Sequence, residues 1–129
     1  MSPSPTFPRV LPPRDVIARA MTEAELLAAV IHLAHVRGWL VHHCRAAKDE
    51  SGRWKTPIQG DAGFVDLVLA RRGSVVFAEL KTERGKLTDE QIVWGSAFIA
   101  AYGGAPTNPL YQVWTPAHWR NGTIEAVLA

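Results

Sequence analysis

The chain has 129 residues, of which 47% are hydrophobic and 20% charged, the composition of one globular domain with a buried core. Its net charge of +2 and pI near 9.0 permit a nucleic-acid partner without requiring one. A single cysteine, Cys44, excludes an internal disulfide and a two-cysteine metal site, and we expect it to be a small buried hydrophobe. No apolar run reaches the roughly 18 residues of a membrane span, and the start does not resemble a signal peptide. We therefore expect a cytoplasmic protein without a membrane partner.

The N-terminal segment, residues 1–20, is rich in proline, which excludes a regular helix or a central strand. We predict an extended arm there, followed by a single domain over residues 21–129. A helix is predicted from Thr22 to about Arg37, with Gly38 as the glycine just past its end. Residues 39–43 are predicted to form a short strand.

The second half of the chain predicts one hairpin and one further helix. Residues 45–62 are polar and contain glycine and proline, which predicts a long loop. Two short apolar runs, 63–70 and 75–81, flank a turn and predict the hairpin. A helix over 88–102 ending at Gly103-Gly104, a strand over 110–114, a helical turn over 116–119 and a tail over 123–128, either strand or helix, complete the chain. The order α-β-β-β-α-β predicts an α/β domain whose mixed central sheet is flanked by helices.

Three charged residues fall at one end of the predicted hairpin. If an even-numbered loop centred on Arg72-Gly73 joins the strands, Asp66 lies opposite Glu79, with Cβ atoms about 4.5–5.5 Å apart. Lys81 follows Glu79 by two residues, so the pleat places both on the same face. Two carboxylates this close repel each other unless a cation lies between them, and a hard divalent ion is the usual one. The alternative is that these are solvated charges at strand ends.

The first predicted helix offers two carboxylates in its first turn. Thr22 and Glu25 fit a capping box, which accounts for Glu25 without a function. Glu23 instead shares the apolar stripe of the helix with Leu27, Val30 and Ala34. A carboxylate aimed at the core is either favoured by the helix dipole alone or is a functional ligand, and we predict the latter.

Gln91 presents a similar choice at the start of the second helix. Thr88 and Gln91 again fit a capping box. Gln91 also shares a helix face with Gly95, Phe98 and Tyr102, which points it inward, and it follows the Glu79-Leu80-Lys81 strand by only one loop. It is therefore predicted to lie over the same site.

Other residues carry weaker signals. Because His42 and His43 alternate faces of a strand, at most one can face the carboxylates, and we expect either to be packed or solvent-facing. Basic residues surround an aromatic one in the long loop, and two more follow Lys81, a composition that suits a phosphate backbone or a solvated loop. The predicted DNA-binding residues are Arg45, Lys48, Arg53, Trp54, Lys55, Arg84 and Lys86.

The ordered run of these residues resembles the PD-(D/E)XK nucleases, and more narrowly their small stand-alone VRR-Nuc branch. That pattern has an early helix Glu, Gly-x-Pro-Asp, a hairpin, (D/E)-x-Lys, a Gly-Lys/Arg-Leu-Ser/Thr loop and Gln. The matching residues, over about 22–115, are Glu23, Gly63 to Asp66, Glu79 to Lys81, Gly85 to Thr88 and Gln91. Val65 stands where the family usually has proline, a position without a catalytic group.

The resemblance implies a restriction-endonuclease-like fold and a catalytic set of Glu23, Asp66, Glu79, Lys81 and Gln91. Asp66 and Glu79 would bind Mg²⁺ or Mn²⁺, with the Leu80 carbonyl and Glu23, directly or through water, as further ligands. Lys81 would act on the attacking water or the transition state, and Gln91 would orient Lys81 or a phosphate. The implied reaction is hydrolysis of phosphodiester bonds in DNA.

Within this resemblance we expect a structure-specific endonuclease that acts on branched DNA such as four-way (Holliday) junctions in recombination or repair, in a bacterial or phage-infected cell. The alternatives are a non-catalytic nucleic-acid-binding or assembly module with the same fold, and an unrelated α/β protein whose charges are structural. A resolvase cuts two opposing strands, so we expect a homodimer. The apolar residues expected at its interface are Phe7, Val10 and Leu11 in the arm, and Trp119 with residues 124–128 in the tail.

Overall fold

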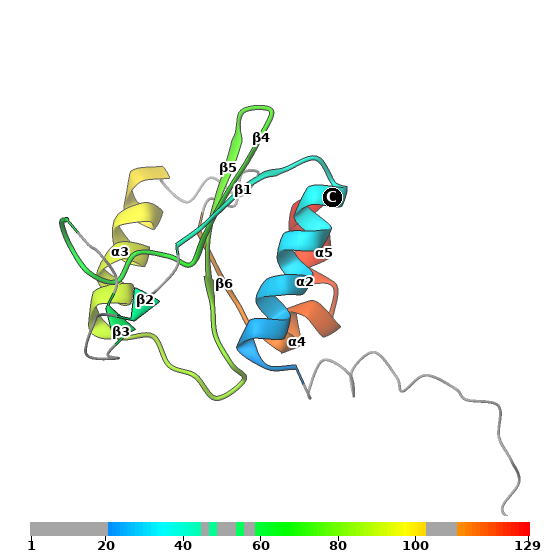
Figure 1. The fold of residues 1–129 in the computed structure, drawn as a ribbon. Coiled ribbons are helices and arrows are strands. Elements are labelled where there is room, and N and C mark those ends of the chain that lie inside the picture. The colour runs from blue at the N-terminus through cyan, green and yellow to red at the C-terminus, as the bar shows by residue number, and fades with distance from the viewer. Residues whose placement is uncertain (1–20, 45–46, 49–53, 56–58, 103–110) are drawn as a thin grey trace, which may run out of the picture.

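The computed structural model describes residues 21–44, 47–48, 54–55, 59–102 and 111–129, so the predicted arm lies outside it. A four-stranded sheet has the order β1 (Leu40–His43), β4 (Leu67–Arg71), β5 (Ser74–Leu80) and β6 (Tyr111–Trp114). The first three are antiparallel neighbours and β6 runs parallel to β5. Figure 1 shows α3 (Asp89–Tyr102) on one face of this sheet and α2 (Glu23–Val36), α4 (Pro116–Arg120) and α5 (Thr123–Leu128) on the other. The predicted α/β class, with a mixed sheet flanked by helices, is confirmed.

The hairpin of β4 and β5 has the predicted register. Leu67 lies opposite Ala78 and Arg71 opposite Ser74, as a two-residue turn requires. Arg72 and Gly73 form that turn with positive φ angles of 46° and 82°. Positive φ at both central positions matches the right-handed twist of the strands, which fixes the pairing on either side.

The first strand of the hairpin is shorter than predicted, because residues 63–66 form a loop rather than its beginning. Gly63 has a φ of 93°, and a Cβ added there would lie 2.5 Å from the carbonyl carbon of Glu90. Only glycine tolerates both the conformation and this close approach to α3. The contact bends the chain away from the ladder, so β4 begins only at Leu67.

The predicted long loop over residues 45–62 also needs correction. It contains two short strands, β2 (Ala47–Lys48) and β3 (Trp54–Lys55), which pair with each other antiparallel. Backbone pairing over two residues requires no apolar alternation, so the composition of this segment did not reveal it.

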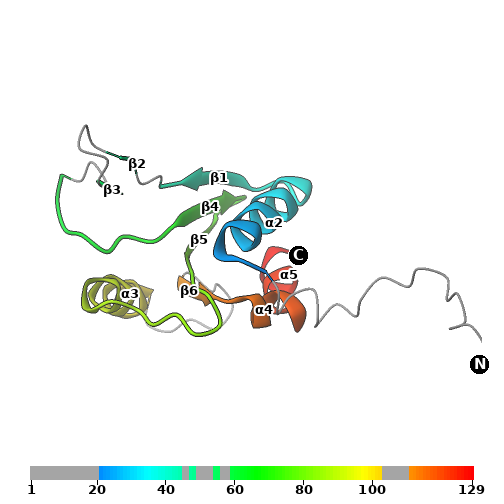
Figure 2. The same ribbon diagram turned by 60° about the horizontal axis from the view of Figure 1, so that its bottom comes forward.

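The core fills the face of the sheet that α2, α4 and α5 cover. Its fully buried members come from α2, from three strands and from the C-terminal helix: Leu26, Val30, Ala34, Leu67, Leu69, Ala78, Trp114, Ile124 and Leu128. Figure 2 shows α2, α4 and α5 grouped on this side. The predicted helix boundaries hold closely, and Gly38, with a φ of 82°, ends α2 as expected. No helix within the described ranges is long and apolar enough to cross a membrane.

The C-terminal tail forms a helix, the second of its two predicted alternatives. Ile124 and Leu128 are fully buried, and Trp119 packs against the same core. The indole of Trp39 donates a hydrogen bond to the carbonyl of Leu128 at 3.1 Å. The prediction that this tail offers free apolar surface for a partner is therefore wrong, because its own domain uses that surface.

Candidate functional site

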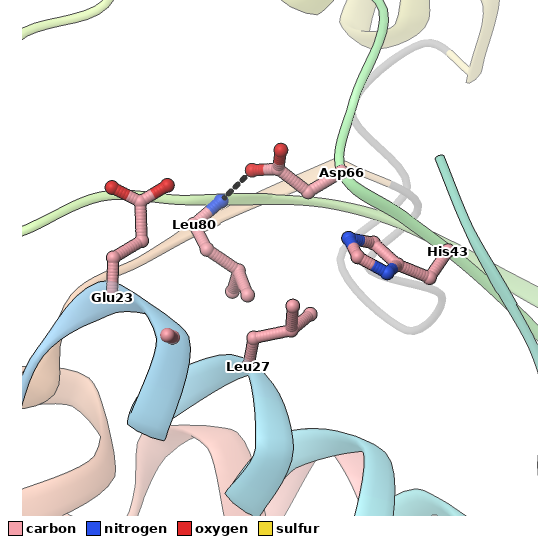
Figure 3. Close-up of a pocket in the computed structure, with 6 residues that line it drawn as sticks. Glu23, Leu27, His43, Asp66 and Leu80 are labelled. Carbon is pink, nitrogen blue, oxygen red and sulfur yellow. Dashed lines mark hydrogen bonds between the residues drawn. The ribbon is translucent and has the colours of Figure 1, made fainter. Parts of the chain in front are cut away.

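Asp66 lies just outside the hairpin ladder, at the end where β4 begins and β5 finishes. Its carbonyl accepts a hydrogen bond from the Cys44 N–H at 3.0 Å, and its carboxylate Oδ2 accepts one from the Leu80 N–H at 2.7 Å (Figure 3). Strand N–H groups point along the plane of a sheet. The Asp66 carboxylate therefore lies between the two faces, and not on the single face that the simple pairing predicts.

Glu79 is buried beside it, with 2% of its surface exposed. Its Oε1 accepts a hydrogen bond from Gln91 Nε2 at 2.8 Å and lies 3.7 Å from Lys81 Nζ. Its Oε2 is buried and has no hydrogen-bond partner in the described part of the chain. Burial raises the pKa of Glu79 to about 8, and the negative charge of Asp66 contributes to this rise. Lys81 opposes this shift and Glu23 adds to it.

A buried carboxylate oxygen without a partner, next to a second carboxylate, fits a hard divalent cation. Asp66 and Glu79 are the residues that would hold it. The described residues contain no group of three or more His, Cys, Asp or Glu side chains placed to bind one ion. Mg²⁺ is often bound by one or two carboxylates and otherwise by water and substrate oxygens, so a pair of carboxylates is compatible with such a site.

Gln91 serves both roles that the sequence left open. Its Oε1 accepts the Thr88 N–H at 2.9 Å and its own N–H donates to Thr88 Oγ1 at 3.2 Å, which is the capping box. Its Nε2 meanwhile donates to Glu79. One side chain thus ties the start of α3 to the buried carboxylate and fixes the orientation of both.

Glu23 reaches the same end of the sheet from the opposite side. A pocket of about 230 Å³ opens there, lined by Glu23, Ala24, Leu27, His43, Asp66 and Leu80. Figure 3 shows the Glu23 side chain extending from the first turn of α2 toward Leu80 and Asp66. Val30 and Ala34 on its stripe are buried, whereas Glu23 is exposed at the pocket mouth, so its predicted direction into the core is wrong. The reason is that the first turn of α2 borders an open pocket.

Glu25, by contrast, forms the predicted capping box. The Thr22 N–H donates to Glu25 Oε1 at 3.3 Å, and the Glu25 N–H donates to Thr22 Oγ1 at 3.1 Å. Of the two glutamates in this turn, only Glu23 lines the pocket that contains Asp66.

No protein-family model, curated protein or solved structure matches this chain. The chemistry of this site is therefore inferred from its own geometry.

Two further residues lie near the site: His43, one of the two histidines that the strand alternation left open, and Tyr111, which the sequence did not single out. His43 lines the pocket while His42 is exposed, as the alternation of a strand requires. Tyr111 lies opposite Phe77 in β6, and burial, followed by the charge of Glu79, raises its pKa. A Cβ added at Gly95 would lie 2.6 Å from the Tyr111 hydroxyl. A glycine on the same face of α3 as Gln91 was therefore the one feature of the sequence that could have indicated a close neighbour such as Tyr111.

The thiol of Cys44 borders the same region. It is partly buried, and burial, followed by the charge of Asp66, raises its pKa. A raised pKa disfavours the thiolate, the form in which a cysteine acts as a nucleophile.

The predicted DNA-binding residues are only partly described. Arg84 and Lys86 are exposed in the loop that follows Lys81. Lys48 lies in β2, and Trp54 and Lys55 lie in β3, but their side chains are outside the described part of the structure. Arg45 and Arg53 lie outside the described residues altogether, so a basic surface at this loop stays a prediction.

The two glutamates of α2 give a direct comparison. Glu23→Gln should lower a metal-dependent activity much more than Glu25→Gln, because only Glu23 faces the pocket, whereas glutamine can replace Glu25 in the capping box. Paired activity and melting measurements on the two variants check this. A larger activity loss in Glu25→Gln, at unchanged melting temperature, would mean that the other carboxylate is the functional one.

The raised pKa of Glu79 predicts a pH-dependent stability. The folded chain keeps a proton on Glu79 up to about pH 8, whereas the unfolded chain releases it near the ordinary value of 4.5. Between these pH values the folded state holds more protons, so the free energy of unfolding falls as pH rises and levels off above pH 8.

Melting curves with chelator present check this prediction. Glu79→Gln should remove most of the slope and should melt higher than the wild type at the upper end of the range, because the amide cannot ionise. Glu83→Gln, at an exposed position in the next loop, is the matched control and should keep the slope. Equal slopes in wild type and Glu79→Gln would contradict the assignment.

Proposed function

We propose that this chain is a metal-dependent DNA endonuclease of the PD-(D/E)XK type, similar to the VRR-Nuc branch. The observation that carries the proposal is the pair of Asp66 and Glu79, with a buried unpaired oxygen on Glu79 and the Lys81 ammonium 3.7 Å from its other oxygen. The order α2-β1-β4-β5-α3-β6, with β6 parallel to β5, supports a restriction-endonuclease-like core.

The residues of the site divide the work of phosphodiester hydrolysis. A bound divalent ion would neutralise the scissile phosphate and lower the pKa of water. Asp66 is held in place by the Leu80 N–H, and Glu79 by Gln91, so both carboxylates are oriented before substrate arrives.

Lys81 is the cation of the site. Its side chain is 17% exposed, which leaves it within reach of substrate while Glu79 holds it in place. In the proposed reaction Lys81 positions the attacking water and stabilises the negative charge that develops on the phosphate. Glu23 lies on the α2 side of the pocket and would bind the same ion directly or through water.

The substrate in this proposal is branched DNA, cut by a homodimer. The tail is buried in its own domain, so the arm over residues 1–20 is the remaining candidate of the two predicted dimer contacts. Light scattering at micromolar concentration tests the assembly. A mass of 14.2 kDa, that of one chain, would contradict the homodimer. It would favour a nuclease that cuts one strand at a time over one that resolves four-way junctions.

Cleavage of labelled linear, flap, splayed and four-way DNA, each with Mg²⁺, Mn²⁺ or chelator, tests the function. We expect metal-dependent cleavage with a preference for the four-way substrate. Tight binding of these DNAs without cleavage in any metal would favour the alternative, a non-catalytic nucleic-acid-binding module. If the protein neither binds nor cleaves any of these DNAs, both the nuclease and the nucleic-acid-binding module are ruled out.

A further inference from the structure

His43 is the polar side chain in the pocket that the proposed mechanism leaves without a role. It lies opposite Leu67, and Leu67 is fully buried on the α2 face of the sheet. The His43 ring therefore emerges on the α2 side, whereas His42 points to the other side and is exposed. Figure 3 shows the ring reaching into the pocket below Asp66.

Among the described residues that line this pocket, a single side chain can donate a hydrogen bond to an anion. Two of the six lining residues are carboxylates, Glu23 and Asp66, and the other three besides His43 are apolar. Lys81 stands apart from this lining, beside Glu79. A phosphate that enters on the α2 side therefore meets His43 as the one side-chain donor among the described lining residues.

The His43 ring is also available. Within the described part of the chain it makes no hydrogen bond or ion pair, and it belongs to no group of three side chains placed to bind a metal ion. An imidazole always carries at least one N–H. A partly buried donor without a partner gains most from a charged acceptor, and a phosphodiester oxygen is one.

We propose that His43 contacts the substrate, donating a ring N–H to a phosphate oxygen of the DNA strand from the α2 side, while Lys81 acts from the Glu79 side. This inference rests on the proposed nuclease function. The two donors then flank the Asp66 carboxylate and hold the strand across it, which would fix the direction in which the strand crosses the end of the sheet.

Leucine and glutamine substitutions separate donation from packing. His43→Leu fills the space without a donor, His43→Gln keeps an N–H near the position of Nε2, and His42→Leu is the matched control on the neighbouring exposed residue. Each is measured for cleavage of labelled DNA, and for DNA binding in a Lys81→Ala background in which cleavage is strongly reduced. We expect His43→Leu to lose about 10- to 100-fold in both measurements, the range for a hydrogen bond to a charged group.

His43→Gln should recover most of this loss, and His42→Leu should behave as its parent. If His43→Leu and His42→Leu are equal in binding and cleavage, or if His43→Gln is as impaired as His43→Leu at unchanged melting temperature, the inference is overturned. A wild type that binds but cuts no DNA would refute the nuclease proposal, yet the binding series in the Lys81→Ala background would still decide the role of His43.

Discussion

Lys81→Ala should lower single-turnover DNA cleavage by about 10³-fold while leaving the fold intact. The lysine ammonium lies 3.7 Å from Glu79 Oε1 and is not an oxygen ligand, so its loss removes charge stabilisation of the transition state and leaves the carboxylate pair in place. Mn²⁺ should therefore still raise the melting temperature of the variant. The effect is large because the described part of the site contains no other cation next to the carboxylate pair.

Lys86→Ala is the matched control for this result. Lys86 is exposed in the loop that follows Lys81, so its loss should weaken DNA binding without changing the rate at saturating DNA. Loss of Mn²⁺ binding in Lys81→Ala, to the extent seen for a carboxylate variant, would contradict the assigned role.

Asp66→Asn should abolish both cleavage and the stabilisation by Mn²⁺. In the wild type, an ion at 100 times its Kd adds about 2.7 kcal/mol to the free energy of unfolding, which is roughly 10 °C for a domain of this size. Asparagine keeps an oxygen that can accept the Leu80 N–H, so the fold is preserved while the charge is lost. Thermal melting with chelator measures whether the fold is preserved, and melting with Mn²⁺ measures the stabilisation by the ion.

Asp61→Asn provides the control for Asp66→Asn. Asp61 is exposed in the loop that precedes Gly63, and its carbonyl, not its carboxylate, accepts the Trp94 indole N–H. This variant should keep the full Mn²⁺ shift. An equal shift in Asp66→Asn and the wild type would place the ion elsewhere.

The elements that could be predicted from sequence are those that depend on local chemistry. Arg72-Gly73 between two apolar runs determines the hairpin register, because a two-residue turn with positive φ leaves one pairing. The capping boxes at Thr22 and Thr88 mark the starts of both long helices. These two features place Asp66 opposite Glu79 and start α3 just before Gln91.

The rest depends on contacts between segments far apart in the chain. Gly63 packs closely against the backbone of Glu90 in α3, β4 begins only at Leu67, and Asp66 lies outside the ladder, where it accepts the Leu80 N–H. Tyr111 comes beside the site only because β6 pairs parallel with β5, a register that no single segment encodes. The burial of Ile124 likewise depends on the docking of α5 against the sheet and α2.

The most direct test of the proposed site is a crystal structure of the wild type with Mn²⁺, in which anomalous scattering locates the ion. We expect a peak in contact with Asp66 and with Glu79 Oε2, the buried oxygen that has no protein partner in the described chain. If no peak lies at this pair at saturating Mn²⁺, above the pH at which Glu79 ionises, Asp66 and Glu79 are not the metal ligands.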